Sequence, residues 1–309
     1  MLILPKGNPL KSIVSAISRV RSRGVPYKTI FFAGALDVFR PMVRQISKLG
    51  LCLHGTCPIC HCNAVFEFKN LRYTLLKCET CEHVFVCNSI SSEDLEKNYS
   101  RSDYWEEDKI HRNIHSMEPG PHWKEFVDRR INPMRELNAM PPLRRSDGSR
   151  SRILEIGSSE GIVLYHLSLM GYEVYGCELN QEIVSRARKY FSHPVIVDHF
   201  LSHDFEELRF DTIISYHTFE HLTNLREIIR KCSDLLVPCG SLLFEVPYGV
   251  EEYHNYDHLH FFSEKSAKRL MSDWFEDIKV MDGSYVTIHQ VKCGSYFVTG
   301  KKPEKGTVR

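Results

Sequence analysis

The chain has 309 residues, of which 42% are hydrophobic and 26% are charged, and its formal net charge is +1. This composition excludes fibrous and disordered chains, and the length indicates about two structural units. No apolar run reaches the roughly 20 residues that span a bilayer. Lys6, Pro9 and Lys11 interrupt the apolar stretch at residues 1–17, which therefore does not resemble a signal peptide. We expect a cytoplasmic protein with no membrane partner, and the balanced charge disfavours a nucleic-acid partner.

The sequence contains 11 cysteines. This density is too low for a disulfide scaffold in a chain of this length, and the odd count leaves at least one thiol unpaired. Without an export signal, we expect a reducing compartment in which the cysteines are thiols or metal ligands.

Residues 1–50 predict a small α/β extension without a chemical signature. The apolar spacing predicts strands at 2–4 and 29–33 and amphipathic helices at 8–23 and 38–49. We expect this extension to have a structural or dimerisation role, which makes a homodimer an option.

Two Cys-x-x-Cys pairs dominate residues 51–104, with 17 residues between them. Two intervening residues let both sulfurs of one turn point to the same metal, and two such turns complete a tetrahedral thiolate shell. The residues between the pairs predict a hairpin, as in a zinc ribbon. The predicted ligands of a structural zinc are Cys57, Cys60, Cys78 and Cys81. Iron is an alternative metal, and His61, Cys62 and His83 could substitute as ligands.

The next two segments differ in pattern. Residues 105–150 predict a helical connector, with a helix at 123–137 that Pro133 could interrupt, and a linker. From 151 to 300, strands and helices alternate, which predicts a parallel sheet covered on both faces. The strands are expected at 152–156, 173–177, 195–197, 212–215, 241–246, 278–281 and 296–299, and the helices at 162–170, 181–190, 225–236 and 263–274. Residues 301–309 predict a flexible tail.

A turn rich in small residues follows the strand at 152–156. It reads ILEIGSSEG from 153 to 161, lets a ligand approach the backbone closely, and leads into a helix N-terminus with free N–H groups. Glu178 ends the next strand, where a carboxylate can accept both ribose hydroxyls. The acid at Glu155 would repel the pyrophosphate of a dinucleotide but would suit the cationic amino-acid end of S-adenosylmethionine. The pattern therefore favours the methyl donor over a dinucleotide.

With these residues, the chain resembles a class I S-adenosylmethionine-dependent methyltransferase. The matching stretches are ILEIGSSEG (153–161), YEVYGCELN (172–180), FDTIISYHTFEHL (210–222), LLVPCGSLLFEVP (235–247) and DHLHFFSEKSAKRLM (257–271). The stretch CETCEHVFV (78–86), with SSEDLEKNYSRSDYW (91–105), is similar to the zinc-ribbon lead-in of a subgroup that includes sugar C-methyltransferases. The resemblance implies a Rossmann-like α/β fold with a mostly parallel seven-stranded sheet, preceded by the four-cysteine ribbon and the short α/β extension.

The resemblance also implies roles for individual residues. The donor turn would be formed by Glu155, Gly157, Ser159 and Gly161, although Ser159 stands where the family usually has glycine. Glu178 would hold the ribose, and the adenine would lie against Leu179, Asp198 and His199. On the acceptor side, His217 and His221 are candidate catalytic bases, and Tyr248, His258 and His260 are candidate substrate contacts.

The expected reaction is methyl transfer by in-line displacement to a small-molecule or nucleotide-linked acceptor. Such a reaction needs mainly alignment of donor and acceptor, and a base only where the acceptor atom carries a proton of high pKa. Two alternatives remain: an RNA methyltransferase that uses the ribbon for RNA contact, and a non-catalytic scaffold that retains the fold.

Overall fold

The computed structural model describes residues 52–70, 72–87, 121–188, 194–254, 257–286 and 292–304. The chain divides after Leu51 into two compact units, and the described residues all belong to the second unit. The extension predicted at 1–50 and most of the connector before residue 121 lie outside the described residues. In the part of the chain that the structure describes, no helix is both long and apolar enough to cross a membrane.

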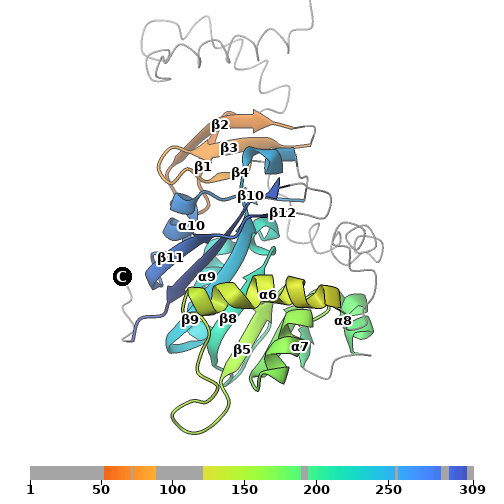
Figure 1. The fold of residues 1–309 in the computed structure, drawn as a ribbon. Helices are drawn as coiled ribbons and strands as arrows, with labels where there is room; N and C mark the ends of the chain where they lie inside the picture. Colours follow the sequence, from red (N-terminus) through yellow and green to blue (C-terminus); the bar gives the residue numbers. More distant parts are fainter. Residues whose placement is uncertain are drawn as a thin grey trace, which may run out of the picture. The chain divides into compact units, whose positions relative to one another are not determined.

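The cysteine-rich segment forms four strands of a five-stranded antiparallel sheet, and these four are drawn in orange in Figure 1. Its strands are β1 (His54–Thr56), β2 (Asn63–Lys69), β3 (Thr74–Cys78), β4 (Val84–Val86) and β10 (His260–Phe261). The predicted hairpin corresponds to β2 and β3. The fifth strand, β10, comes from far along the chain and pairs with β4. The ribbon therefore shares its sheet with the C-terminal part of the protein.

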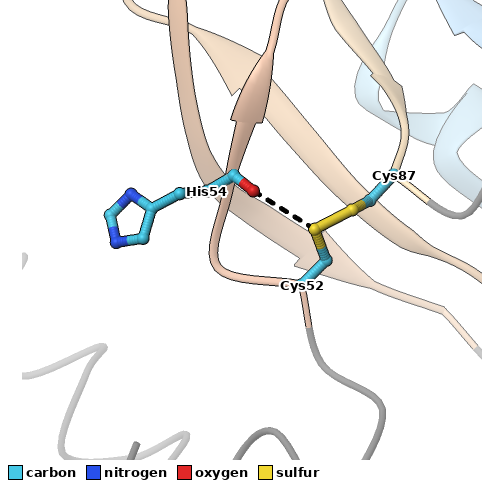
Figure 2. The surroundings of a disulfide bond; sticks show 3 residues. All are labelled: Cys52, His54 and Cys87. Atoms are coloured by element: carbon cyan, nitrogen blue, oxygen red, sulfur yellow. Dashed lines mark hydrogen bonds between the residues drawn. A yellow bond between two sulfur atoms is a disulfide. The ribbon is translucent and has the colours of Figure 1, made fainter.

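A disulfide between Cys52 and Cys87 joins the residues that flank β1 and β4 (Figure 2). The expectation that every cysteine is a thiol or a metal ligand is therefore wrong for this pair. Their bonding follows from strand order, because the sheet brings the two ends of the ribbon within a Cα–Cα distance of 6.3 Å, in the range a disulfide can bridge. The pairing also removes one argument for a reducing compartment.

The α/β part contains a seven-stranded sheet in the order β11-β14-β9-β8-β5-β6-β7. The strands are β5 (Arg152–Ile156), β6 (Glu173–Glu178), β7 (Val195–Val197), β8 (Phe210–Tyr216), β9 (Leu236–Pro247), β11 (Glu276–Asp282) and β14 (Ser295–Lys301). The pairings from β9 to β7 are parallel, and β14 runs antiparallel to both of its neighbours. This arrangement is the predicted Rossmann-like fold, and each predicted strand lies within an observed one.

The helices are α6 (Pro121–Glu136), α7 (Ile162–Leu169), α8 (Gln181–Ala187), α9 (Leu225–Leu235) and α10 (Glu264–Met271). Short 3-10 helices, η1 (Phe219–His221) and η2 (Val250–His254), follow β8 and β9, and β12 (Tyr285–Val286) pairs with β13 (Lys292–Cys293). Pro133 lies inside α6 without ending it. One lost backbone hydrogen bond is tolerated there because the apolar face of α6 is buried against the sheet.

The sheet separates two hydrophobic cores. On one face α6 and α7 pack over Ile153 and Ile214, and on the other α9 and α10 pack over Leu154 and Ile213 (Figure 1). Consecutive residues of one strand point to opposite faces, which explains why these strands are apolar at nearly every position. Because β5, β6, β8 and β9 run parallel, their carboxyl ends meet at one edge of the sheet, which is where such sheets bind ligands.

Candidate functional site

The turn after β5 has the backbone that its glycines predict. Gly157 has a φ of +70°, and a Cβ there would lie 2.3 Å from Thr218 Oγ1. Gly161 has a φ of +75° and precedes the first turn of α7. Both positions are in the left-handed region that glycine adopts without a steric cost. The turn can therefore bring backbone N–H groups close to a bound ligand.

Ser159 occupies a left-handed position in this turn, with a φ of +47°. Its backbone N–H donates a 2.9 Å hydrogen bond to Glu178 Oε2, and its hydroxyl donates one of 2.6 Å to Glu160 Oε2. The substitution of serine for the usual glycine is therefore accommodated, although a left-handed residue with a Cβ carries a cost of about 1–2 kcal/mol.

Glu178 joins the turn to the end of β6. Its second oxygen, Oε1, accepts a hydrogen bond of 3.0 Å from the Asn180 backbone N–H. The side chain is buried, and burial raises its pKa. Because β5 and β6 are adjacent parallel strands in register, the turn and the acid predicted from separate segments lie side by side.

Glu155 lies beneath the turn on β5 and is 4% exposed. Burial raises the pKa of its carboxyl to about 8, against the opposing effect of Arg130. Its Oε2 has no hydrogen-bond partner among the described residues. A buried acid of this kind can be ionised by a cationic group that binds nearby.

The other predicted donor contacts lie next to Glu178. Leu179 follows it directly and is half-buried, and β7 pairs with β6 so that Val197 lies opposite Glu178. Asp198, just after β7, accepts a 2.7 Å hydrogen bond from the His199 N–H and lies 3.0 Å from His203 Nδ1. These contacts lower the pKa of Asp198.

His217 follows β8 in a left-handed conformation, with a φ of +49°. Its Nδ1 lies 3.4 Å from Glu220 Oε1, and its Nε2 lies 3.2 Å from Glu245 Oε1. Burial opposes the charged imidazole, but the two carboxylates outweigh it and raise the pKa of His217 to about 9. At neutral pH this side chain is therefore a hydrogen-bond donor rather than the free base that the sequence predicted.

Glu245 is a member of this network that sequence reasoning missed. It is fully buried on β9, where Arg129 Nη1 (2.7 Å) and Ser295 Oγ (2.9 Å) donate to its Oε1. Burial opposes ionisation, but His217 and the nearby arginines hold the pKa of Glu245 well below its usual range. The available signal was an acid inside the otherwise apolar run LLFEVP, which points to a paired buried charge.

Three further candidates have different surroundings. His221 Nδ1 lies 2.9 Å from the Asp257 carbonyl oxygen, and its ring packs edge-on against His258 with centroids 4.8 Å apart. Tyr248 stacks on Tyr296, and its hydroxyl lies 2.9 Å from Ser284 Oγ. Both histidines therefore lie together beside η1, whereas Tyr248 is engaged with the C-terminal strands.

His260 faces the ribbon. Its Nδ1 lies 3.0 Å from Nε2 of His83, its Nε2 lies 2.9 Å from the Leu222 carbonyl oxygen, and the side chain is buried. With both ring nitrogens engaged, His260 links the two parts of the protein. We therefore do not place His260 in the acceptor site, although the sequence predicted it as a substrate contact.

The four predicted cysteine ligands converge. The Sγ–Sγ distances are 3.6 Å for Cys57–Cys81, 3.4 Å for Cys60–Cys78 and 3.5 Å for Cys60–Cys81. A tetrahedral zinc with bonds of about 2.3 Å separates its sulfurs by about 3.8 Å, so the donor set fits this ion closely.

The residues that follow the two Cys-x-x-Cys pairs complete the ribbon turns. His61 and Glu82 have φ values of +59° and +65°, the conformation for which many ribbons use glycine. The alternative ligands point elsewhere, because Cys62 Sγ contacts the Cys60 carbonyl oxygen and His83 contacts His260. The four cysteines are thus the one thiolate cluster among the described residues.

Comparison with known proteins agrees with this geometry. Residues 123–274 match the family described as "Methyltransferase domain". This match assigns a methyltransferase domain to 152 of the 309 residues. Similar curated proteins include the ubiquinone biosynthesis O-methyltransferases of Xanthomonas euvesicatoria (27% identical, 36% of this chain and 51% of the relative) and Proteus mirabilis (28%, 37% and 49%). The chain thus spans about half the length of the curated relatives it matches.

Two solved structures are similar to the chain at low identity. The N-methyltransferase NodS from Bradyrhizobium japonicum, in complex with S-adenosylhomocysteine, has a TM-score of 0.45 and 18% identity, covering 69% of this chain and 98% of NodS. The PH0226 protein from Pyrococcus horikoshii has a TM-score of 0.47 and 14% identity, covering 65% and 99%.

The methyltransferase domain and the ribbon share a sheet although they are separate in sequence. The matched segment starts at Trp123 in α6, after the ribbon, yet it contributes β10 to the ribbon sheet. The same segment supplies the turn after β5, Glu178 and the cluster around His217. The ribbon therefore contacts the methyltransferase domain beside η1, whose Glu220 carbonyl oxygen accepts a hydrogen bond from the Leu259 N–H.

Proposed function

We propose that this protein transfers the methyl group of S-adenosylmethionine to a small-molecule acceptor. The observation that supports this most directly is the hydrogen bond between the Ser159 N–H and Glu178, which joins the turn and the ribose-binding acid into one site. Glu155 beneath it suits the cationic amino-acid end of the donor. Gly157 and Gly161 give the backbone the close approach that such a ligand needs.

The proposed acceptor carries a hydroxyl group. The similar curated proteins are named O-methyltransferases, and the edge beyond the donor turn gathers polar side chains that can hold an oxygen. The sulfonium is a good leaving group, so alignment and exclusion of water supply most of the catalysis. His217, whose two ring nitrogens face Glu220 and Glu245, would place a positive charge beside the acceptor. The balanced net charge of +1 disfavours RNA as the acceptor.

We also propose that the four cysteines hold a structural zinc ion. Four thiolates leave no open coordination position, so the ion would stabilise the ribbon and take no part in the chemistry. It would restrain a small sheet whose own apolar core is limited.

The donor site is tested by calorimetric titration with S-adenosylhomocysteine. We expect micromolar binding, and Glu178→Ala should weaken it by about 1–3 kcal/mol, the scale of charge-assisted hydrogen bonds. Glu182→Ala is the matched control, because Glu182 is an exposed acid four residues further on. Unchanged affinity in the Glu178 variant would show that Glu178 does not bind the ribose. No binding by the wild type would favour the scaffold function.

A further inference from the structure

Glu245, a buried acid on β9, contacts the residue that follows β8. Its carbonyl oxygen accepts a 3.0 Å hydrogen bond from the His217 N–H, and its Oε1 lies 3.2 Å from His217 Nε2. Glu245 therefore holds both the backbone and the ring of His217. We propose that Glu245 is a positioning residue, which fixes the charged His217 ring beside the acceptor, and that Arg129 on α6 orients Glu245 for this role.

The backbone at His217 needs such a restraint. Its φ of +49° is in the left-handed region, which is unfavourable for a residue with a Cβ. Tyr216, the last residue of β8, pairs with Glu245 in the parallel register, so the chain leaves the sheet at this contact. A strained conformation persists only where its surroundings hold it, and such positions concentrate in functional sites. The strain is therefore consistent with a turn that places the His217 ring.

Three groups from different elements converge on one oxygen of Glu245. Arg129 Nη1 on α6 donates a 2.7 Å hydrogen bond to Oε1, and Ser295 Oγ on β14 donates one of 2.9 Å. His217 Nε2 is the third group at this atom. The side chain of Glu245 is fully buried, and a buried carboxylate is stable only when its charge is compensated. Arg129 and Ser295 thus fix the carboxylate, and the carboxylate in turn fixes the ring.

A second carboxylate faces the other nitrogen of the ring. Glu220 Oε1, on η1, lies 3.4 Å from His217 Nδ1. Carboxylate oxygens only accept hydrogen bonds, so one at each nitrogen favours the ring in which both nitrogens are protonated. Burial opposes this charge, but Glu245 and Glu220 outweigh it and raise the pKa of His217 to about 9. The ring is therefore a cation held between two anions.

Arg129 is held by a second contact. Its guanidinium lies 4.0 Å over the ring of Tyr285 on β12, and only 22% of its side chain is exposed. Burial opposes ionisation of Glu245, but His217, Arg130 and Arg129 together keep the pKa of Glu245 well below its usual range. The helix α6 therefore supplies the positive charge that lets Glu245 stay ionised in the core.

The ring of His217 is the exposed end of this network. The side chains of Glu220 and Glu245 are fully buried, whereas 30% of the His217 side chain is exposed at the carboxyl end of β8. This edge of a parallel sheet is where ligands bind. A charge that is fixed in place before the reaction stabilises a developing negative charge without reorganisation. The network therefore presents a fixed positive charge at the edge where the acceptor is expected.

The use of this charge rests on the proposed function, whereas the positioning of His217 does not. A hydroxyl beside a positive charge loses its proton to solvent more readily, since the opposite charge favours the ionised form. An oxygen lone pair then forms the bond to the methyl carbon while the carbon–sulfur bond breaks, and the electron pair returns to sulfur. The products are the methyl ether and S-adenosylhomocysteine. His217 keeps its proton throughout, so it acts by its charge and not as a base.

The test is a pH titration of the His217 ring in the full-length protein, without donor or acceptor, followed by ¹⁵N nuclear magnetic resonance. The titratable and charged side chains around this ring are Tyr216 on β8, Glu220 and His221 on η1, Glu245 on β9, Arg129 and Arg130 on α6, and His258 before β10. His217→Asn assigns the resonance. We expect the wild-type ring to be charged at pH 7 and to titrate at about pH 9.

Two variants should move this midpoint in opposite directions. Glu245→Gln should lower it by at least about one pH unit, a 10-fold weaker hold on the proton, because the ring loses an anion. Arg129→Gln should raise it, because the ring loses a neighbouring cation. Glu227→Gln is the matched control, because Glu227 is an exposed acid on α9 and its loss should leave the midpoint unchanged.

The opposite signs distinguish positioning from a merely structural role, since loss of structure would move both variants toward the midpoint of an ordinary histidine. An ordinary midpoint in the wild type, an unchanged one in Glu245→Gln, or shifts of the same sign in the two variants would overturn the proposal. Should Glu245→Gln fail to fold, the wild-type midpoint and the direction of the Arg129→Gln shift still decide. Titration with S-adenosylhomocysteine is a separate readout, and absent donor binding with a midpoint of about 9 would refute only the methyl transfer.

Discussion

The ribbon and the seven-stranded sheet are stabilised in different ways. The ribbon is closed by a disulfide and by four converging cysteines, whereas the sheet is stabilised by the hydrophobic cores on its two faces. Short strands such as β1 and β4 bury little apolar surface, so cross-links contribute more of their stability. The comparison indicates that chemical changes to cysteines should act on the ribbon, and changes to backbone strain or burial on the sheet.

The two regions are nevertheless not independent. Ile59 and Leu76 of the ribbon belong to the same core cluster as Phe244 of the sheet. Arg226 on α9 donates a 3.0 Å hydrogen bond to the Ile59 carbonyl oxygen, and Ser263 contacts the Cys81 carbonyl oxygen. Damage to the ribbon should therefore reach the acceptor edge through β10 before it reaches the donor turn.

The largest expected effect comes from Cys78→Ser. Structural zinc sites contribute about 10–16 kcal/mol of binding energy in small domains, so losing one thiolate should release the metal and unfold the ribbon. Metal analysis and thermal unfolding would show both losses together, while S-adenosylhomocysteine still binds. Full metal retention would contradict the ligand assignment, and loss of donor binding would show that damage to the ribbon extends to the turn after β5.

Cys87→Ser should have a smaller effect that depends on the metal. Closing the loop of 35 residues between Cys52 and Cys87 is worth about 3–4 kcal/mol when nothing else restrains it. The metal would restrain the same loop. The substitution should therefore lower the free energy of unfolding by about 1 kcal/mol in the metal-bound protein and by more after chelation. Urea unfolding with and without metal measures this coupling, and equal losses in the two conditions would show that the two restraints are independent.

Glu155 should make the stability of the sheet depend on pH. Its pKa is raised from 4.5 to about 8 by burial, so the folded state holds the proton more tightly than the unfolded state. Stability should therefore fall as pH rises from about 5 to 8. The Glu155→Gln variant lacks this pH-dependent contribution. It should be more stable than the wild type by about 1–3 kcal/mol at pH 8, with a smaller difference at pH 5. A constant difference between variant and wild type would contradict the assignment.

Ser159→Gly should give the smallest change, and a stabilising one. Glycine relieves the left-handed strain at φ +47°. This should raise the free energy of unfolding by about 0.5–1 kcal/mol, after subtraction of the entropy that glycine adds to the unfolded state. Ser168→Gly, inside α7, should instead destabilise by about 1 kcal/mol. Chemical denaturation of both variants checks the opposite signs, and destabilisation of the Ser159 variant would show that its hydroxyl bond to Glu160 dominates.

Local patterns in the sequence were sufficient for much of this structure. Cysteine spacing predicted the convergence of Cys57 and Cys60 with the second pair, because a short turn constrains both sulfurs. The apolar runs predicted β5 and β8, because strands buried on both faces leave few polar positions. The turn before Gly161 and the acid Glu178 were predicted together, since both end adjacent parallel strands.

The contacts that sequence reasoning missed all join segments that are distant along the chain. These are the Cys52–Cys87 bond, the pairing of β10 with the ribbon, and the burial of Glu245 between His217 and Arg129. His258 and His260 are separated by one residue, yet one faces Glu220 and the other faces His83, because side chains alternate where the chain enters a strand. The sequence by itself determined the elements and the donor turn, through short-range spacing and periodicity. Only the tertiary structure decided which charges meet at the acceptor edge, because those pairings depend on how the sheets pack.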